Sequence, residues 1–214
     1  MLLNNFSVIY INLETRPDRN VRVLNELKKI GVTEPERFKA IKLDNGALGC
    51  SMSHLKCMEL AKQKDYDYVF ICEDDIEFLD HELFLLQLNK FLVSDIRWDV
   101  VLVAGNNMLP YKPINDNCIQ IYNCQTTTGY IVKKHYYDTL IKNYKEGIQN
   151  LIKNPDNNEY KIDKHWFKLQ RSDNWYLIIP LTIVQREDYS DIEKKTTNFK
   201  NYMLNYNKTY KPTK

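Results

Sequence analysis

The feature that most constrains this chain of 214 residues is an apolar run that ends abruptly in three acids. Residues 68–72 are continuously apolar, which is typical of a central strand in a parallel sheet that is covered on both faces. Glu73, Asp74 and Asp75 follow at the carboxyl end of this run. Three adjacent carboxylates repel one another, so we expect a cation or a set of hydrogen-bond donors beside them. The alternative is that the acids cap a following helix.

Strand and helix patterns alternate along the chain. Apolar runs predict strands at residues 7–13, 37–41, 98–103, 119–122, 126–132 and 175–179. Helical spacing predicts helices at 18–30, 51–63, 81–92 and 134–144, with loops at 46–49 and 150–158. Ser51 and Ser53 are candidate caps of the second helix. This alternation favours an α/β sheet that binds ligands beyond the carboxyl ends of its strands. We expect one domain over residues 1–192 and a polar tail over 193–214.

Composition excludes several classes of protein. The net charge is +2, with 43% hydrophobic and 27% charged residues, which is ordinary for a globular protein. Both charge signs are interspersed, so we expect no nucleic-acid partner. No apolar run approaches the roughly 18 residues of a transmembrane span. The five cysteines include no CxxC pair, and their odd number favours a reducing compartment. We therefore expect a cytoplasmic protein, either in solution or peripheral to a membrane.

Several polar residues suit a phosphate-bearing ligand. Arg16 and Arg19 lie in the loop after the first predicted strand, where a guanidinium can contact a diphosphate. Ser53 and His54 lie near a predicted helix start, where free N–H groups bind anions. No acid is spaced for a triad with them, so they do not predict a hydrolase. Asp74 or Asp75 can hold Mg²⁺ or Mn²⁺, which take oxygen ligands and bridge substrate phosphates. Each of these side chains, taken singly, also suits a surface charge or a structural contact.

The order of these motifs resembles glycosyltransferase family 25 from about residue 7 to residue 192. The matching elements are Ile11-Asn12-Leu13 with Arg16 and Asp18-Arg19; Arg37-Phe38-Lys39-Ala40; Gly46 through Gly49-Cys50 with Ser53-His54; Glu73-Asp74-Asp75; Thr128-Gly129-Tyr130-Ile131-Val132; Ile162-Asp163; and Pro180 with Gln185 and Ser190-Asp191-Ile192. Two departures are Pro17, where the family usually has a second arginine, and Gly129, where Ala is common.

The family includes lipopolysaccharide and procollagen galactosyltransferases, so the resemblance implies a GT-A-like fold, a UDP-sugar donor and inversion at the anomeric carbon. We therefore expect a metal-dependent transfer of galactose or glucose to a saccharide or protein hydroxyl, with Mn²⁺ or Mg²⁺ as cofactor. The expected donor-binding residues are Asn12, Arg16, Arg19, Ser53, His54, Glu73, Asp74 and Asp75, of which Asp74 and Asp75 are expected to hold the metal.

An inverting transfer needs a carboxylate that takes the proton of the acceptor hydroxyl. Asp163 is the first candidate because it matches the family's hydrophobic-Asp element. Asp173 and Asp191 are alternatives for this role. Asp163 could instead cap a helix that starts at Lys164.

Four residues are expected on the acceptor side. His165 and Trp166 follow Asp163 and offer rings that can stack on a sugar. Gly129 interrupts a predicted strand, which suggests a close backbone approach. Gln185 and His165 are candidates for a further metal ligand.

Two other functions remain open at this stage. A carbohydrate-binding protein could keep the fold and lose catalysis, although the intact acids at 73–75 count against this. A nucleotidyltransferase can also combine an α/β sheet with metal-binding carboxylates, although the chain has no glycine-rich phosphate loop near residue 1.

Overall fold

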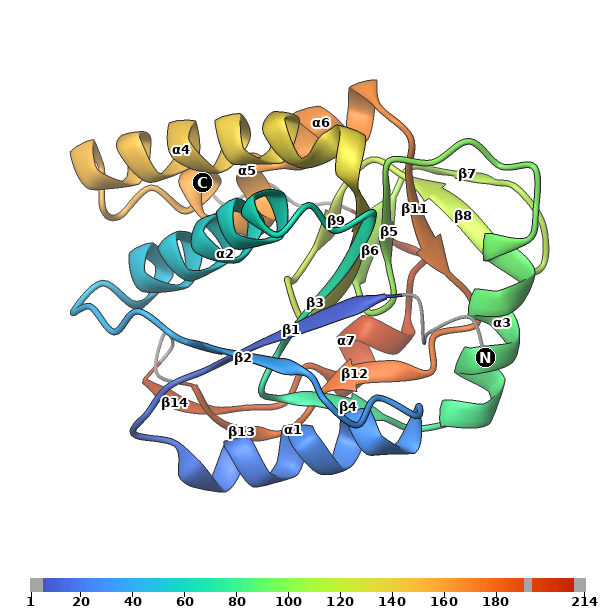
Figure 1. Cartoon of the computed structure of the whole chain (residues 1–214). Helices are drawn as coiled ribbons and strands as arrows, with labels where there is room; N and C mark the ends of the chain where they lie inside the picture. Colours follow the sequence, from blue (N-terminus) through green and yellow to red (C-terminus); the bar gives the residue numbers. More distant parts are fainter. Residues whose placement is uncertain (1–5, 191–193, 210–214) are drawn as a thin grey trace.

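The computed structural model describes residues 6–190 and 194–209 and has a central eight-stranded sheet with helices on both faces (Figure 1). β10 and β8 run antiparallel to their neighbours, and the other strands share one direction. In spatial order the strands are β2 (Glu36–Lys39), β1 (Ser7–Asn12), β3 (Tyr68–Glu73), β10 (Gly129–Lys133), β5 (Val100–Leu102), β11 (Trp175–Ile178), β8 (Cys118–Ile121) and β7 (Tyr111–Pro113). This confirms the predicted α/β class with a mostly parallel central sheet.

Helices cover the sheet on both faces and enclose two apolar cores. α1 (Pro17–Lys29) and α3 (His81–Leu92) pack on one face. On the other face lie α2 (Gly46–Gln63), α4 (Tyr137–Lys153), α5 (Ile162–His165) and α6 (Phe167–Ser172) (Figure 1). Two short 3₁₀ helices, η2 (Lys134–Tyr136) and η3 (Asn158–Tyr160), flank α4.

β3 shows why its sequence is continuously apolar. Successive side chains of a strand point to opposite faces of the sheet. Val69 and Ile71 therefore pack in the core under α2 and α4, whereas Phe70 and Cys72 pack in the core under α1 and α3. All four are 0% exposed, so no position between Val69 and Cys72 can carry a polar side chain without a buried partner.

Short strands and one helix complete the end of the sheet where β3 terminates. They are β4 (Ile76–Phe78) with β12 (Ile183–Gln185), β13 (Asp188–Ser190) with β14 (Lys195–Thr197), β6 (Asn106–Leu109) with β9 (Cys124–Gln125) and β15 (Lys208–Thr209), and α7 (Lys200–Leu204). Of the tail expected at 193–214, residues 194–209 are described, and Met203 there is 1% exposed.

The start of α2 differs from the prediction. The helix begins at Gly46, and the Asn45 side chain caps it by accepting a hydrogen bond from Leu48 N at 3.0 Å. Ser51 and Ser53 are therefore not caps: inside the helix, each hydroxyl donates to the carbonyl one turn earlier. Gly49 lies within α2, and glycine is needed there because a Cβ at this position would be 2.4 Å from the Ile41 carbonyl oxygen.

Other boundaries were closer to expectation. The predicted helix at 81–92 is confirmed as α3, and the first predicted helix ends as expected, since Gly31 has a φ of 81° directly after α1. The predicted loop at 150–158 begins too early, because α4 continues to Lys153 and buries Leu151 in the core.

Candidate functional site

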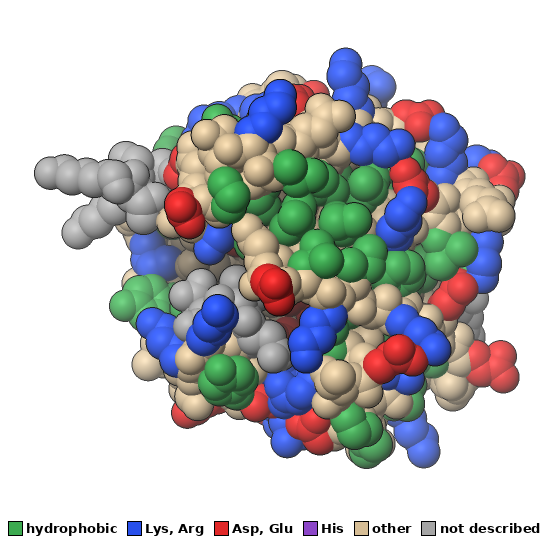
Figure 2. All heavy atoms as spheres, turned by 90° about the vertical axis from the view of Figure 1, so that its left-hand side faces the viewer, with side chains coloured by type: hydrophobic (Ala, Val, Ile, Leu, Met, Phe, Trp, Pro, Cys, Tyr) green, Lys and Arg blue, Asp and Glu red, His purple; other side chains and the backbone are tan. Residues whose placement is uncertain are grey.

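Two cavities meet at the carboxyl end of β3. The first has a volume of about 450 Å³ and the second about 370 Å³. Cys50, Glu73, Gln185 and Ser190 line both cavities, so these four residues form a shared wall. Figure 2 shows the side of the molecule that lies on the left in Figure 1, where the chain passes from β1 to α1. Acidic and basic side chains surround a hollow near the middle of this face. Ligand-binding clefts of α/β sheets lie at this end of the strands.

Asp74 is surrounded by hydrogen-bond donors. Asn12 Nδ2 donates to Asp74 Oδ2 at 2.6 Å, and Arg19 Nη1 donates to Asp74 Oδ1 at 3.1 Å. Arg37 in turn donates to Asn12 Oδ1 at 2.6 Å and orients this amide. Burial still raises the pKa of Asp74 above its ordinary value. The expectation that the acids need donors beside them is therefore met by Asn12 and Arg19.

Asp75 is less completely satisfied. Gln185 Nε2 donates to Asp75 Oδ2 at 2.8 Å, and Arg19 Nη1 lies 3.8 Å from the same oxygen. Asp75 Oδ1 is buried and has no hydrogen-bond partner among residues 6–190 and 194–209. Burial, followed by the neighbouring charges of Glu73 and Asp74, raises the pKa of Asp75 to about 8. The chain continues from Asp75 into β4, so the acids do not cap a helix.

Glu73 lies in the shared wall and collects several donors. Thr127 Oγ1 donates to Glu73 Oε1 at 2.5 Å, and His54 Nε2 lies 3.1 Å from the same oxygen. Cys50 Sγ is 3.8 Å away. Burial opposes ionisation of Glu73, but the contacts with His54 and Thr127 hold its pKa below the ordinary value. These contacts favour the ionised form of Glu73 and fix the carboxylate between side chains from α2 and from the segment before β10.

Ser53 and His54 both line the first cavity. The argument that placed them at a helix start was wrong, because α2 begins at Gly46 and their N–H groups lie inside the helix. Ser53 Oγ instead accepts a hydrogen bond from Ile41 N at 2.9 Å. This contact fixes the loop that forms another side of the first cavity.

Three arginines of α1 and its preceding loop converge on one carboxylate. Asp188 Oδ2 accepts from Arg16 Nη2 at 3.0 Å, from Arg19 Nε at 3.3 Å and from Arg22 Nη1 at 2.8 Å. Arg16 also makes two hydrogen bonds to Asp18. Of the two arginines predicted from the sequence, Arg19 is the one that reaches Asp74 and lines the first cavity.

Asp163 lies on the wall of the second cavity. Its Oδ2 accepts a hydrogen bond from Thr126 N at 3.3 Å, and burial raises its pKa above the ordinary value. α5 begins at Ile162, and its N-cap, Lys161, makes no side-chain capping bond. The alternative that Asp163 caps a helix starting at Lys164 is therefore wrong. Asp191, an alternative base, lies outside the described residues.

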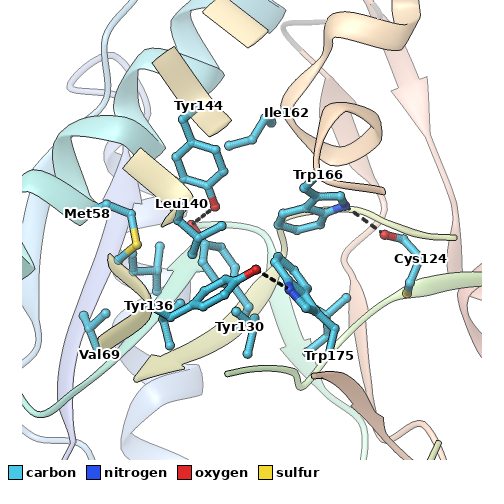
Figure 3. Packing of buried hydrophobic residues seen from close by; sticks show 14 of the residues in the cluster. Met58, Val69, Cys124, Tyr130, Tyr136, Leu140, Tyr144, Ile162, Trp166 and Trp175 are labelled. Carbon is cyan, nitrogen blue, oxygen red and sulfur yellow. Dashed lines mark hydrogen bonds between the residues drawn. The ribbon is translucent and has the colours of Figure 1, made fainter. Parts of the chain in front are cut away.

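The residues expected beside Asp163 point elsewhere. Trp166 is 0% exposed, donates from Nε1 to the Cys124 carbonyl oxygen at 3.0 Å and packs edge-on against Trp175 (Figure 3). No face of this ring is open to a sugar, so the stacking role expected of it is corrected to a role in the core. His165 packs against Gly147 of α4, with its Nε2 3.7 Å from Glu146 Oε1.

Gly129 and Asp173 also make contacts within the fold and line neither cavity. Gly129 pairs with Cys72 in the sheet, and a Cβ on it would lie 2.9 Å from Val103 Cγ2. The close approach expected at this glycine is thus present, but inside the core. Asp173 accepts a hydrogen bond from the Tyr136 hydroxyl.

Sequence reasoning did not single out four side chains at the cavities. Thr127 was hidden inside a predicted strand, and Cys50 was noted only as part of a motif. Asp188 and Phe199 come from the end of the chain, where no apolar periodicity marks them. Phe199 lines the second cavity and is 36% exposed, so it offers the partly open aromatic ring that Trp166 does not.

Comparisons with known proteins agree with the motif order. A family model described as glycosyltransferase family 25 (LPS biosynthesis protein) matches residues 38–152. Over 91 residues, 42% of this chain, the sequence is 32% identical to a protein of Haemophilus influenzae named putative glycosyltransferase. The match spans 31% of that protein's length.

Two solved structures share the arrangement of elements loosely. A protein from STIV has a TM-score of 0.48 and 13% identity, covering 97% of this chain and 98% of that chain. A glycosyltransferase involved in the glycosylation of the major capsid of PBCV-1 has a TM-score of 0.44 and 8% identity, covering 81% and 93%. Both TM-scores are below 0.5, so neither likeness bears on function.

Within the part of the chain that the structure describes, none of the helices has the length and apolar character needed to cross a membrane.

Proposed function

Because the chain belongs to glycosyltransferase family 25, we propose that it transfers a hexose, galactose or glucose, from a UDP-sugar to a hydroxyl of a saccharide or glycoprotein. Transfer proceeds with inversion at the anomeric carbon. The observation that carries this proposal is the pair of cavities that meet at Glu73, with buried acids in one and Asp163 in the other. A two-substrate transfer needs two sites that share a boundary at which the sugar is exchanged.

The first cavity suits the nucleotide sugar. Arg19, Lys42 and Lys194 line it together with Asp74 and Asp75, so it presents cationic groups to a diphosphate. Its volume of about 450 Å³ falls within the roughly 300–1,000 Å³ of small-molecule sites.

Asp74 and Asp75 fit a hard divalent cation. The fit rests on Asp75 Oδ1, a buried carboxylate oxygen without a hydrogen-bond partner among the described residues, because such an atom is costly unless a cation or donor reaches it. Mn²⁺ or Mg²⁺ bound by these carboxylates would stabilise the negative charge of the leaving diphosphate. Arg19 holds Asp74 at the same place and shares in neutralising the cluster.

The second cavity suits the acceptor. Asp163 is the proposed base that takes the proton of the attacking hydroxyl. Thr126 N holds one carboxylate oxygen of Asp163, which fixes the orientation of the group. Its raised pKa brings it nearer to neutral pH, where a base accepts a proton more effectively. Phe199 provides an aromatic wall for the acceptor ring.

The protein is proposed to work in the cytoplasm, in solution or at the periphery of a membrane. All five cysteines are free thiols, which suits a reducing compartment.

The direct test measures UDP release from UDP-glucose, UDP-galactose, UDP-GlcNAc and GDP-mannose, with Mn²⁺, Mg²⁺ or EDTA. We expect metal-dependent release of UDP from one hexose donor. The variant Asp75→Asn should lose turnover and keep the wild-type unfolding midpoint, whereas Asp116→Asn, an exposed acid outside both cavities, should keep wild-type rates. A rate within a few-fold of wild type for Asp75→Asn would remove this residue from the site.

Two other functions have distinct outcomes in the same experiment. A nucleotidyltransferase would transfer the nucleotide, so mass analysis of the acceptor would show a nucleotidyl product in place of a hexose adduct. A carbohydrate-binding protein of this fold would bind saccharide and release no UDP from any donor.

A further inference from the structure

One cluster of ligand-type side chains lies in the wall between the two cavities and has been given no chemical step in the proposed transfer. Cys50, His54 and Glu73 place a thiol sulfur, an imidazole nitrogen and a carboxylate oxygen within 4.8 Å of one another. Asp74 and Asp75 offer only oxygen atoms, which suit hard cations. Sulfur and imidazole nitrogen favour softer divalent cations.

We propose that Cys50, His54 and Glu73 bind Zn²⁺ at the wall between the two cavities, separately from the hard cation proposed for Asp74 and Asp75.

The separations in the cluster match those of a tetrahedral zinc site. With Zn–N and Zn–O lengths of about 2.0–2.1 Å and Zn–S of about 2.3 Å, the tetrahedral N···O and S···O edges are about 3.3 and 3.6 Å. The structure has His54 Nε2 to Glu73 Oε1 at 3.1 Å and Cys50 Sγ to Glu73 Oε1 at 3.8 Å. These two edges are within a few tenths of an ångström of the tetrahedral values, and the third edge, from Cys50 Sγ to the imidazole nitrogen of His54, is no longer than 4.8 Å.

Two elements hold these ligands in place before any cation binds. Cys50 and His54 are four residues apart in α2, so their side chains lie on the same face of the helix. Glu73 is the last residue of β3, and the four residues before it, 69–72, are completely buried. Rigid elements on both sides favour metal binding, because less conformational freedom is lost on coordination.

A hydrogen bond behind His54 completes the arrangement. Histidine ligands of zinc usually donate their second ring nitrogen to a nearby oxygen, which fixes the ring and its tautomer. His54 Nδ1 lies 2.8 Å from the Tyr130 hydroxyl, and that hydroxyl lies 3.3 Å from the Tyr144 hydroxyl. Both tyrosine rings are buried in the core (Figure 3). Without a cation, His54 donates from Nε2 to Glu73; when a cation binds, the proton moves to Nδ1, where the Tyr130 oxygen accepts it, and the Nε2 lone pair is available to the metal.

Binding of Zn²⁺ requires one proton to leave the cluster. The Cys50 thiol loses its proton to solvent as the Zn–S bond forms, and the imidazole binds as the neutral form with its proton on Nδ1. Glu73 exchanges its contacts with His54 and Cys50 for a bond to the cation. Cys50 and Glu73 line both cavities, so a fourth ligand, water or a substrate hydroxyl, can approach from either one.

The test uses Co²⁺ as a spectroscopic substitute for Zn²⁺ in the full chain. We expect one equivalent of Co²⁺ to give a thiolate charge-transfer band in the near ultraviolet, and Zn²⁺ to abolish it by displacement. Cys50→Ser should lose the band. Cys118→Ser, which changes a buried cysteine of β8, and Asp75→Asn should retain it. Absence of the band in the wild type, or its persistence in Cys50→Ser, would overturn the proposal.

Two further variants separate coordination from general damage to the fold. Glu73→Gln changes a partly exposed side chain and should weaken Zn²⁺ binding in isothermal titration calorimetry by at least about tenfold. Tyr130→Phe removes the hydroxyl behind His54 and should weaken Zn²⁺ binding by about 10–100-fold. Unchanged affinity in both variants would contradict the site even if Cys50→Ser failed to fold.

Discussion

The substitution Gly129→Ala tests whether the sheet beneath the site is as tightly packed as the structure indicates. The added Cβ would lie 2.9 Å from Val103 Cγ2, 3.2 Å from Ile76 Cδ1 and 3.4 Å from Phe70 Cε2. Carbon atoms in favourable contact are about 3.5–4.0 Å apart. Branching at Cβ restricts the χ1 rotamers of valine, so Val103 has few ways to turn away from the added methyl group.

The expected loss of stability follows from two opposing effects. Overpacking a core by one methyl group costs about 1–3 kcal/mol. Alanine recovers about 0.5–1 kcal/mol of the backbone entropy that glycine loses in a strand. Because a contact of 2.9 Å forces the neighbouring atoms to shift, the upper part of the overpacking range, about 2–3 kcal/mol, applies, and we expect a net destabilisation of about 1–2.5 kcal/mol. For a chain of this length, that lowers the thermal midpoint by about 2–10 °C.

The assay is calorimetric or circular-dichroism melting of Gly129→Ala, Val103→Ala and the double variant. Val103→Ala removes the atom in closest conflict, so Gly129→Ala should cost less in that background, with a coupling of about 0.5–2 kcal/mol. Thr128 O, next to Gly129, accepts the hydrogen bond of Glu73 N at 3.1 Å, so UDP release should fall as well. An unchanged or raised midpoint for Gly129→Ala, or equal costs in both backgrounds, would refute the packing argument.

The other predictions concern the second cavity and acid stability. Asp163→Asn should leave donor affinity unchanged and slow transfer by about 10²–10⁴-fold. Fluorescence titration measures the donor affinity and single-turnover kinetics measure the transfer rate; a transfer rate within a few-fold of wild type would remove Asp163 from this role. Phe199→Ala should raise the KM for the acceptor and spare donor hydrolysis; an unchanged acceptor KM would exclude the ring from that site. Burial opposes ionisation of Asp99, but hydrogen bonds from His135 and Asn174 hold its pKa below the ordinary value. This stabilisation is present above the unfolded pKa of about 3.9 and is lost as pH falls through the folded pKa, so Asp99→Asn should lose stability less steeply below pH ~4 in urea titrations.

The sequence allowed the central part of the fold to be predicted. Continuous apolar runs mark β3 and β11 because both faces of these strands are buried, and the acids after β3 stand out because they interrupt such a run. The start of α2 was mispredicted because two glycines suggested a loop. Only the position of the Ile41 carbonyl shows that Gly49 is required by close packing inside a helix.

The side chains around the acids could be predicted in part. Asn12 is the last residue of β1 and Arg19 lies in α1, the next element; because β1 neighbours β3, local order along the chain brings both residues to Asp74. The orientation of Trp166 could not be predicted, because a four-residue helix gives no periodicity from which to assign its buried face. Asp188 reaches the arginines through a long-range contact that no local pattern encodes.

The contact between Arg19 and Asp188 has a consequence for how the protein forms during translation. The two residues are 169 positions apart, and a ribosome synthesises this length in about 8–34 s at about 5–20 residues per second. Asp74 is synthesised well before Asp188, so a nascent chain can pair Arg19 with Asp74 while the second carboxylate is still missing. The sheet strands β1 and β3 are also complete by then. A growing chain can therefore pair β1 with β3 before the wall of the first cavity is finished, and β13 and β14, which are synthesised later, complete that wall.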